Sequence, residues 1–148
     1  MQQSPQDLQL KIEPRVRTLR TLWVGMLFSI LLYYGLTLFV GPLENSTPNS
    51  ALSLIFVGVA ISTTLISVPL KANLLARSVE QQQVGLVQQA YIIAWALTEV
   101  AALLGLIDFF LTGDRYYYVL FLISAIGHLL HIPRRQHLSD ACFKGPTY

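Results

Sequence analysis

The sequence predicts an all-α membrane protein, a bundle of four transmembrane helices with both termini in the cytoplasm. Hydrophobic residues make up 53% of the 148-residue chain and charged residues only 12%, about half the charged fraction of an ordinary soluble domain. Four long apolar runs follow one another, and basic residues gather on one side of them. We therefore expect a single membrane domain over residues 1–148.

The four apolar runs define the predicted spans. The first two runs carry no charge, the third contains Glu99 and Asp108, and the fourth has His128 and His131 near its end. A helix of about 20 apolar residues crosses the ~30 Å hydrocarbon core, and a helix satisfies its own backbone in lipid. The predicted spans cover residues 22–40, 51–70, 90–111 and 116–132.

The connections predict which helices are neighbours. Residues 112–115 join the last two spans, so these helices are predicted to be antiparallel neighbours. Residues 71–89 are polar and rich in glutamine, and they predict extensions of the second and third helices around a turn near Val84 and Gly85. Prolines and a glycine within residues 41–50 separate the first two helices.

The basic residues predict the orientation. Nine of the ten lie on one side of the predicted spans, and only Arg115 lies on the other. The positive-inside rule then places residues 1–18 and the tail 133–148 in the cytoplasm. Arg134 and Arg135 follow the last span, where we expect them to contact lipid headgroups. The predicted location is the inner (cytoplasmic) membrane of a bacterium.

Glu99 is the strongest functional candidate in the sequence. It lies near the middle of its span, where an ionised carboxylate costs at least a few kcal/mol. Removal from water favours the neutral form of a carboxyl group, and such a group can take up and release a proton when its surroundings change. We expect Trp95 to shield it from lipid and Thr98 to support it. The hydroxyls able to hydrogen-bond it are those of Thr98, Ser62, Thr63, Tyr33 and Tyr34.

Small residues predict the packing face of the third helix. They recur at helical spacing, which lets helix backbones approach closely. Glu99 projects roughly 130° away from this stripe at 100° per residue, so the acidic face and the packing face are distinct. The predicted packing residues of the third helix are Ala90, Ala94, Ala101 and Gly105. The small partners in the second helix are Gly58 and Ser62, together with Ala60, Thr64 and Ser67.

One stretch resembles a known family. Residues 93–99 (Ile-Ala-Trp-Ala-Leu-Thr-Glu), followed by Gly105 and Phe110, resemble the second helix of rotary ATP synthase c subunits, the proteolipids. That helix carries Ala-Leu-x-Glu, then apolar residues and a glycine. Arg77 and Glu80 resemble the family's polar loop, whose consensus is Arg-Gln-Pro-Glu, although Gln-Pro is missing here.

The resemblance covers about residues 51–113. It implies a helical hairpin, a ring of identical copies, and Glu99 as the carrier of the transported proton. Asp108 and the first and fourth helices have no counterpart in that hairpin, and the regular glycine repeat of the family's first helix is absent. We expect Asp108 at the headgroup level, hydrated or paired with Arg115.

Three interpretations of the function stay open. The first is a small proteolipid-like proton-binding subunit, and the second is an accessory or scaffold subunit of a respiratory or photosynthetic complex with a structural Glu99. The third is a small transporter. The expected partners are other membrane subunits or copies of the chain, and lipid. A net charge of +2 does not favour nucleic acid, and no catalytic motif indicates an enzyme.

The two histidines of the fourth span are candidate ligands. His128 and His131 lie three residues apart, and either could bind a metal, a chlorophyll magnesium or a haem iron. The simpler interpretation places them at the interface beside Arg134 and Arg135, among lipid phosphates. A metal site also needs a third or fourth ligand. We therefore predict bound lipid and no other cofactor.

Overall fold

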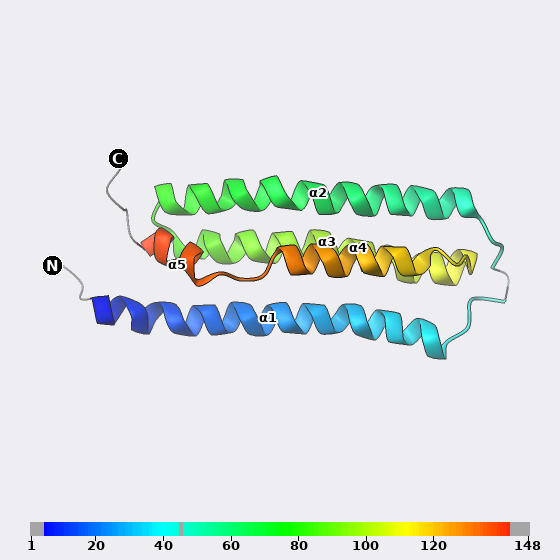
Figure 1. Ribbon diagram of the computed structural model, residues 1–148, viewed down its shortest axis with the longest axis horizontal. Coiled ribbons are helices and arrows are strands. Elements are labelled where there is room, and N and C mark those ends of the chain that lie inside the picture. Colours follow the sequence, from blue (N-terminus) through cyan, green and yellow to red (C-terminus); the bar gives the residue numbers. More distant parts are fainter. Residues whose placement is uncertain (1–4, 45, 143–148) are drawn as a thin grey trace.

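The computed structural model describes residues 5–44 and 46–142, and its five elements are all helices. The predicted all-α class is confirmed for these residues. The helix axes lie along one common long axis, and the helices form an elongated bundle (Figure 1). They are α1 (Pro5–Phe39), α2 (Ser50–Glu80), α3 (Val84–Thr112), α4 (Tyr117–Leu130) and α5 (Arg135–Cys142).

Three helices are long and apolar enough to cross a membrane, namely α1, α2 and α3. The fourth predicted span is shorter than expected, because α4 has 14 residues and measures about 21 Å at 1.5 Å per residue. It stops where His131 leaves the helical conformation at φ −106° and ψ 31°. Pro133 follows two residues later, and helices commonly end before a proline.

The two ends of the bundle differ in what they contain. One end, called the α5 end below, holds the start of α1, the α2–α3 turn and α5. The opposite end, called the Gly113 end, holds residues 40–44 and 46–49 and the α3–α4 turn (Figure 1). Among the described residues, Arg115 is the basic residue at the Gly113 end. Lys144, part of the predicted asymmetry, lies outside the described residues.

The α2–α3 pair makes the most extensive helix contact in the molecule. The predicted extensions of both helices are confirmed, but the reversal occupies residues 81–83, before Val84 and Gly85. Gln82 adopts the left-handed conformation at φ 50°, which turns the chain over three residues. Gly85 needs no special conformation and lies in the first turn of α3.

The antiparallel α3–α4 pair is also confirmed. Gly113 ends α3 at φ 59°, and its N–H donates to the Phe109 carbonyl, a C-terminal cap that favours glycine. Further along α3, a Cβ on Gly105 would lie 3.1 Å from the Cβ of Leu120 and 3.2 Å from the Tyr117 carbonyl oxygen. The small residue at 105 therefore lets α4 lie close to α3, as predicted.

The predicted small face of α3 is buried, whereas only part of the small set predicted for α2 is buried. Ala90, Ala94 and Ala101 are each at most 1% exposed. By contrast Gly58 and Ser62 are exposed, and a Cβ on Gly58 would meet nothing within 4 Å. A helix turns 100° per residue, so residues two positions after Gly58 and Ser62 lie on nearly the opposite side of α2, which faces inward. This inward set of α2 is Ala60, Thr64 and Ser67.

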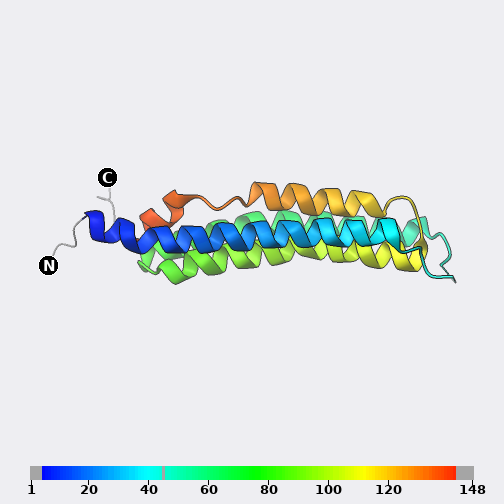
Figure 2. The same ribbon diagram turned by 90° about the horizontal axis from the view of Figure 1, so that it is seen from below.

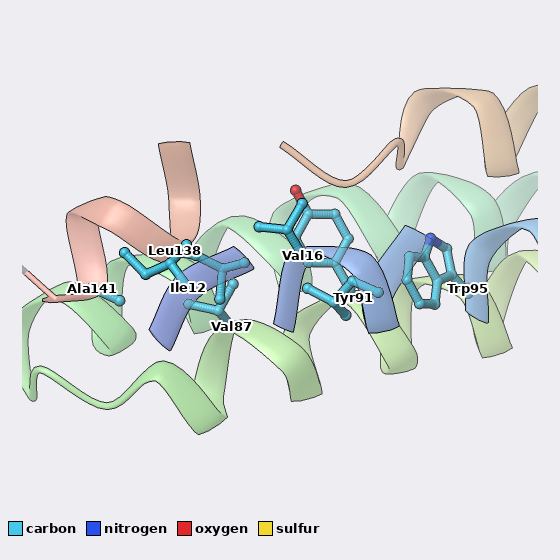
Figure 3. Packing of buried hydrophobic residues seen from close by; sticks show 8 residues of the cluster. Ile12, Val16, Val87, Tyr91, Trp95, Leu138 and Ala141 are labelled. Carbon is cyan, nitrogen blue, oxygen red and sulfur yellow. The ribbon is translucent and has the colours of Figure 1, made fainter. Parts of the chain in front are cut away.

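A hydrophobic core closes the α5 end. Ile12 and Val16 of α1, Val87 of α3 and Leu138 and Ala141 of α5 form one buried cluster (Figure 3). The tail after the last predicted span is therefore partly folded, because α5 turns back over α1 and α3. Figure 2 shows α1 lying along the length of the bundle, with α5 near its beginning.

Candidate functional site

Glu99 belongs to α3, and its side chain lies between α3 and α1. Its Oε1 accepts a hydrogen bond from the Ser29 hydroxyl at 2.7 Å and a long one from the Tyr33 hydroxyl at 3.5 Å. All three side chains are partly buried. The predicted separation of the acidic face from the packing face is confirmed, because Glu99 faces α1 while the small stripe faces α2 and α4.

Ser29 can serve both protonation states of Glu99. Its Oγ lies 2.7 Å from the Met26 carbonyl oxygen as well as 2.7 Å from the carboxyl, but a hydroxyl carries one hydrogen. When Glu99 is ionised, Ser29 donates that hydrogen to the carboxylate. When Glu99 is protonated, the carboxyl donates to Ser29 Oγ, and Ser29 donates to Met26. A proton can therefore come and go without a partner being lost.

Thr98 and Trp95 bind elsewhere than we expected. The Thr98 hydroxyl donates to the Trp95 carbonyl at 2.9 Å and contacts His128 Nδ1 at 2.9 Å. The Trp95 indole donates to the His131 carbonyl at 3.0 Å. Both side chains are fully buried toward the end of α4 rather than beside the Glu99 carboxyl. Thus the hydrogen-bond partners of Glu99 come from α1.

The two histidines are buried and do not lie at a lipid interface. His128 is 0% exposed and His131 is 2% exposed, and His131 Nε2 lies 2.7 Å from Ser67 Oγ. The Ser67 hydroxyl also donates to the Thr64 carbonyl at 2.6 Å, so Ser67 joins the backbone of α2 to the His131 ring. Thr98 joins the Trp95 carbonyl of α3 to the His128 ring in the same way.

Each ring contacts a hydroxyl through one of its nitrogens, His128 through Nδ1 and His131 through Nε2. Within the described part of the chain the opposite nitrogens, His128 Nε2 and His131 Nδ1, have no hydrogen-bond partner, and the same holds for Thr64 Oγ1 and Ser124 Oγ. We call this enclosed set the histidine cluster: Thr64, Ser67, Thr98, Ser124, His128 and His131.

The histidine cluster does not fit a macrocycle. A Cβ on Gly127 would lie 2.6 Å from Thr98 Cγ2 and 3.1 Å from Thr64 Cγ2, so three helices meet closely here. A haem or chlorophyll needs an open face beside its ligand, and both rings point into this packed interior. Residues 5–44 and 46–142 also contain no group of three or more His, Cys, Asp and Glu side chains able to hold a metal.

Asp108 is a second buried acid, contrary to our expectation of a hydrated or Arg115-paired residue. It is 0% exposed, and its Oδ1 accepts from Ser53 at 2.8 Å and from Thr112 at 3.0 Å. Asp108 lies three residues after Gly105, so it continues the buried stripe of α3. Its contact with Ser53 ties α3 to α2 near the Gly113 end.

Tyr91 links α3 to the α5 end. Its hydroxyl accepts from the Arg134 backbone N–H at 3.0 Å and also contacts His137 Nδ1 at 2.6 Å. Burial lowers the pKa of His137, and the positive charges of Lys71 and Arg134 lower it further. These effects favour a neutral His137 ring beside Tyr91. The Lys71 ammonium lies 4.8 Å from the Tyr91 ring centroid, within cation–π range.

Comparison of the chain with protein-family models, with curated proteins and with solved structures gave no match. The resemblance to the proteolipid hairpin therefore rests on the residues that carry it.

Proposed function

We propose that this chain is a non-enzymatic integral membrane subunit of a larger complex and that it binds and releases a proton at Glu99. The observation that carries the proposal is the contact of Ser29 Oγ with both Glu99 Oε1 and the Met26 carbonyl. This arrangement supplies a partner to either protonation state.

The proposal includes four membrane crossings with both termini in the cytoplasm of a bacterium. The alternation of the connections between the two ends supports it (Figure 1), and so does the position of Arg115 opposite the other described basic residues. Although α4 is short, exposed Tyr116 and Tyr118 lie at its beginning. Such residues are typical of the membrane interface.

The exposed apolar surface of the chain supports a role as a subunit of a larger assembly. Phe28 of α1 and Leu54 of α2 are 59% and 68% exposed, and these two helices bury little of their apolar length within the chain. Lipid or partner helices would cover this surface. Since α1 lies on the Glu99 side of α3, a neighbouring copy would reach the carboxyl only past α1. This favours a subunit of low copy number over a ring of many copies.

Carbodiimide labelling tests proton binding at Glu99. A hydrophobic carbodiimide reacts with protonated carboxyl groups that are reachable from lipid, so we expect label on Glu99 that declines as pH rises. Glu99→Gln should abolish the label. Asp108 is a matched internal control, because it is fully enclosed and should stay unlabelled. Absence of label on Glu99 throughout pH 5–9, in protein that is folded, would contradict the proposal.

A structural Glu99 in an accessory subunit is the second candidate function. The Ser53–Asp108 and Ser67–His131 bonds favour it, because this chain uses buried polar contacts to join its helices. In that case Glu99→Gln should keep the particle intact and Glu99→Ala should weaken it. The native mass of the particle in mild detergent identifies the assembly: one or two copies among other subunits fit a low-copy subunit, and many identical copies fit a ring.

A further inference from the structure

A basic groove runs along α1 at the α5 end. It has a volume of about 980 Å³ and opens to the outside of the bundle. Three arginines line it against a single acid, Glu13, so the lining carries a net charge of +2 (three positive, one negative). The lining residues used below are Arg17, Thr18, Arg20, Thr21, Leu22 and Arg135.

The position of the groove along α1 matches the headgroup layer of a membrane. The uncharged run of α1 begins at Leu22, and Arg20 and Arg17 precede it by two and five residues. At 1.5 Å per residue these are about 3 Å and about 7.5 Å along the helix axis. The headgroup layer is roughly 5–8 Å thick on each side of the hydrocarbon core, so both arginines are expected at its depth if the hydrocarbon core begins at Leu22.

The third cation comes from the other end of the chain. Arg135 is the first residue of α5, and it reaches α1 because Leu138 and Ala141 pack against Ile12 and Val16 (Figure 3). Arg134 does not line the groove, and its backbone N–H binds Tyr91 instead. The folded tail therefore assembles a three-arginine site from two distant segments.

We propose that this groove binds the phosphate of an anionic phospholipid, held by Arg17, Arg20 and Arg135. Guanidinium groups match phosphate oxygens with paired hydrogen bonds. The Thr18 hydroxyl already donates to the Pro14 carbonyl, so Thr21 is the hydroxyl with a hydrogen to offer. The arginines are exposed, which leaves their donors accessible to a ligand.

The apolar surface beside the groove favours a lipid over a free anion. Leu22 lines the groove and is 41% exposed, and the apolar run continues along α1 through Val24 and Phe28, which are 56% and 59% exposed. An acyl chain that leaves the headgroup site can lie on this surface, and burial of apolar surface adds to its binding. Inorganic phosphate would gain only the contacts to the arginines.

Native mass spectrometry of the full chain tests the site. The protein is extracted in mild detergent from vesicles of phosphatidylglycerol and phosphatidylcholine mixed 3:7, and the retained lipid is identified by mass. We expect retained phosphatidylglycerol in the native protein. Arg17→Gln, Arg20→Gln and Arg135→Gln should each weaken retention by about fivefold, the effect of one basic residue near a membrane surface. The double variant Arg17→Gln/Arg20→Gln should lose it almost completely.

Two control variants separate a built site from diffuse attraction. Arg15→Gln removes the same charge from the same helix, but Arg15 lines a different, smaller groove with Leu138. Arg115→Gln removes a charge at the Gly113 end. Both should keep phosphatidylglycerol at the native level. Equal losses in Arg15→Gln and Arg17→Gln would overturn the proposal, because they would indicate attraction without a site.

Two further arms identify the source of the phosphate. Displacement of phosphatidylglycerol by millimolar inorganic phosphate would overturn the lipid proposal in favour of a free anion. Equal retention of phosphatidylcholine would overturn the role of net charge. Glu99→Gln should leave lipid retention unchanged, so the outcome at this groove is independent of proton binding at Glu99.

Discussion

At Glu99, the hydroxyl hydrogen of Ser29 has two acceptors, one for each protonation state of the carboxyl group. Ser29 offers its hydrogen to the carboxylate or to the Met26 carbonyl, both at 2.7 Å. The neighbouring Thr98 lies in the interior instead, where its hydroxyl contacts the Trp95 carbonyl and His128 Nδ1. Adjacent residues of α3 thus have separate partners, with Glu99 facing α1 and Thr98 facing α4.

Replacement of Ser29 by alanine is expected to destabilise the protein. The change removes the shortest hydrogen bond of the partly buried Glu99, and leaving such a group without its partner costs about 1–3 kcal/mol. The measurement is the free energy of unfolding in detergent, followed by tryptophan fluorescence.

The matched control is Ser62→Ala. Ser62 is also a serine in a long apolar helix, but it is exposed and donates only to the Gly58 carbonyl. We expect a change within about 0.5 kcal/mol for this variant. Equal effects of the two substitutions would show that the Ser29–Glu99 contact contributes no stability.

At the scale of elements, the helices are held together by different chemistry along their length. Apolar side chains join α1, α3 and α5 at one end. The histidine cluster joins α2, α3 and α4 in the interior, and Asp108 joins α2 and α3 near the Gly113 end. Between the last two lies an apolar layer of Ala60, Ala101 and Leu120. The two buried polar groups are therefore separate sites.

Acid is expected to loosen α5. Because the pKa of His137 is lowered in the folded protein, the unfolded chain binds more protons at pH values below the ordinary histidine value of about 6.5. Stability is therefore full above about pH 6.5 and declines as pH falls through that value. The contact at stake is the 2.6 Å one between His137 Nδ1 and the Tyr91 hydroxyl, which joins α5 to α3.

Hydrogen-exchange protection factors of α5 at pH 7.5 and 5.5 measure this effect. Protection should drop at the lower pH in the native chain. His137→Gln keeps an acceptor for Tyr91 but does not titrate, so its protection should change much less. A native chain whose α5 is equally protected at both pH values would contradict the role of His137.

At the scale of the whole molecule, α4 decides the topology. With three crossings, α5 would lie on the opposite side from the start of α1, but the fold brings these two segments together at one end. Only a helix that returns along the bundle allows that arrangement, and α4 runs back beside α3 (Figures 1 and 2). We therefore expect α4 to behave as a crossing despite its 14 residues.

Single cysteines introduced into a Cys142→Ser background test this topology. With a thiol reagent that cannot cross membranes, Thr47→Cys and Tyr116→Cys should react from the outside of intact cells. Gln82→Cys and Gln136→Cys should react only in inverted vesicles. All four positions are exposed, so burial does not confuse the result. Labelling of 116 and 136 from the same side would exclude a crossing by α4.

Hydropathy and helical spacing alone determined the helices and much of their packing. Lipid leaves the backbone few ways to satisfy its hydrogen bonds, so long apolar runs predicted α1, α2 and α3 near their observed places. Small residues at a period of 3.6 predicted the buried face of α3, and the same geometry predicted that Glu99 faces away from it.

Only the tertiary structure decided which polar groups meet. The inward face of α2 depends on a rotation of about 200° between Gly58 and Ala60, and small residues occur on both sides of that helix. The burial of Asp108 depends on Ser53, which is 55 residues away in sequence. Likewise the burial of His128 and His131 depends on partners in α2 and α3.

Contacts between segments that are distant in the sequence also form the two sites proposed for this protein. The partner of Glu99 is Ser29, 70 residues earlier in the chain, although the spacing of Ser29 and Tyr33 by four residues does place them on one face of α1. The basic groove needs α5 to fold back onto α1 before Arg135 can join Arg17 and Arg20. Composition supplies such polar groups, and long-range packing of apolar surface determines which of them come together.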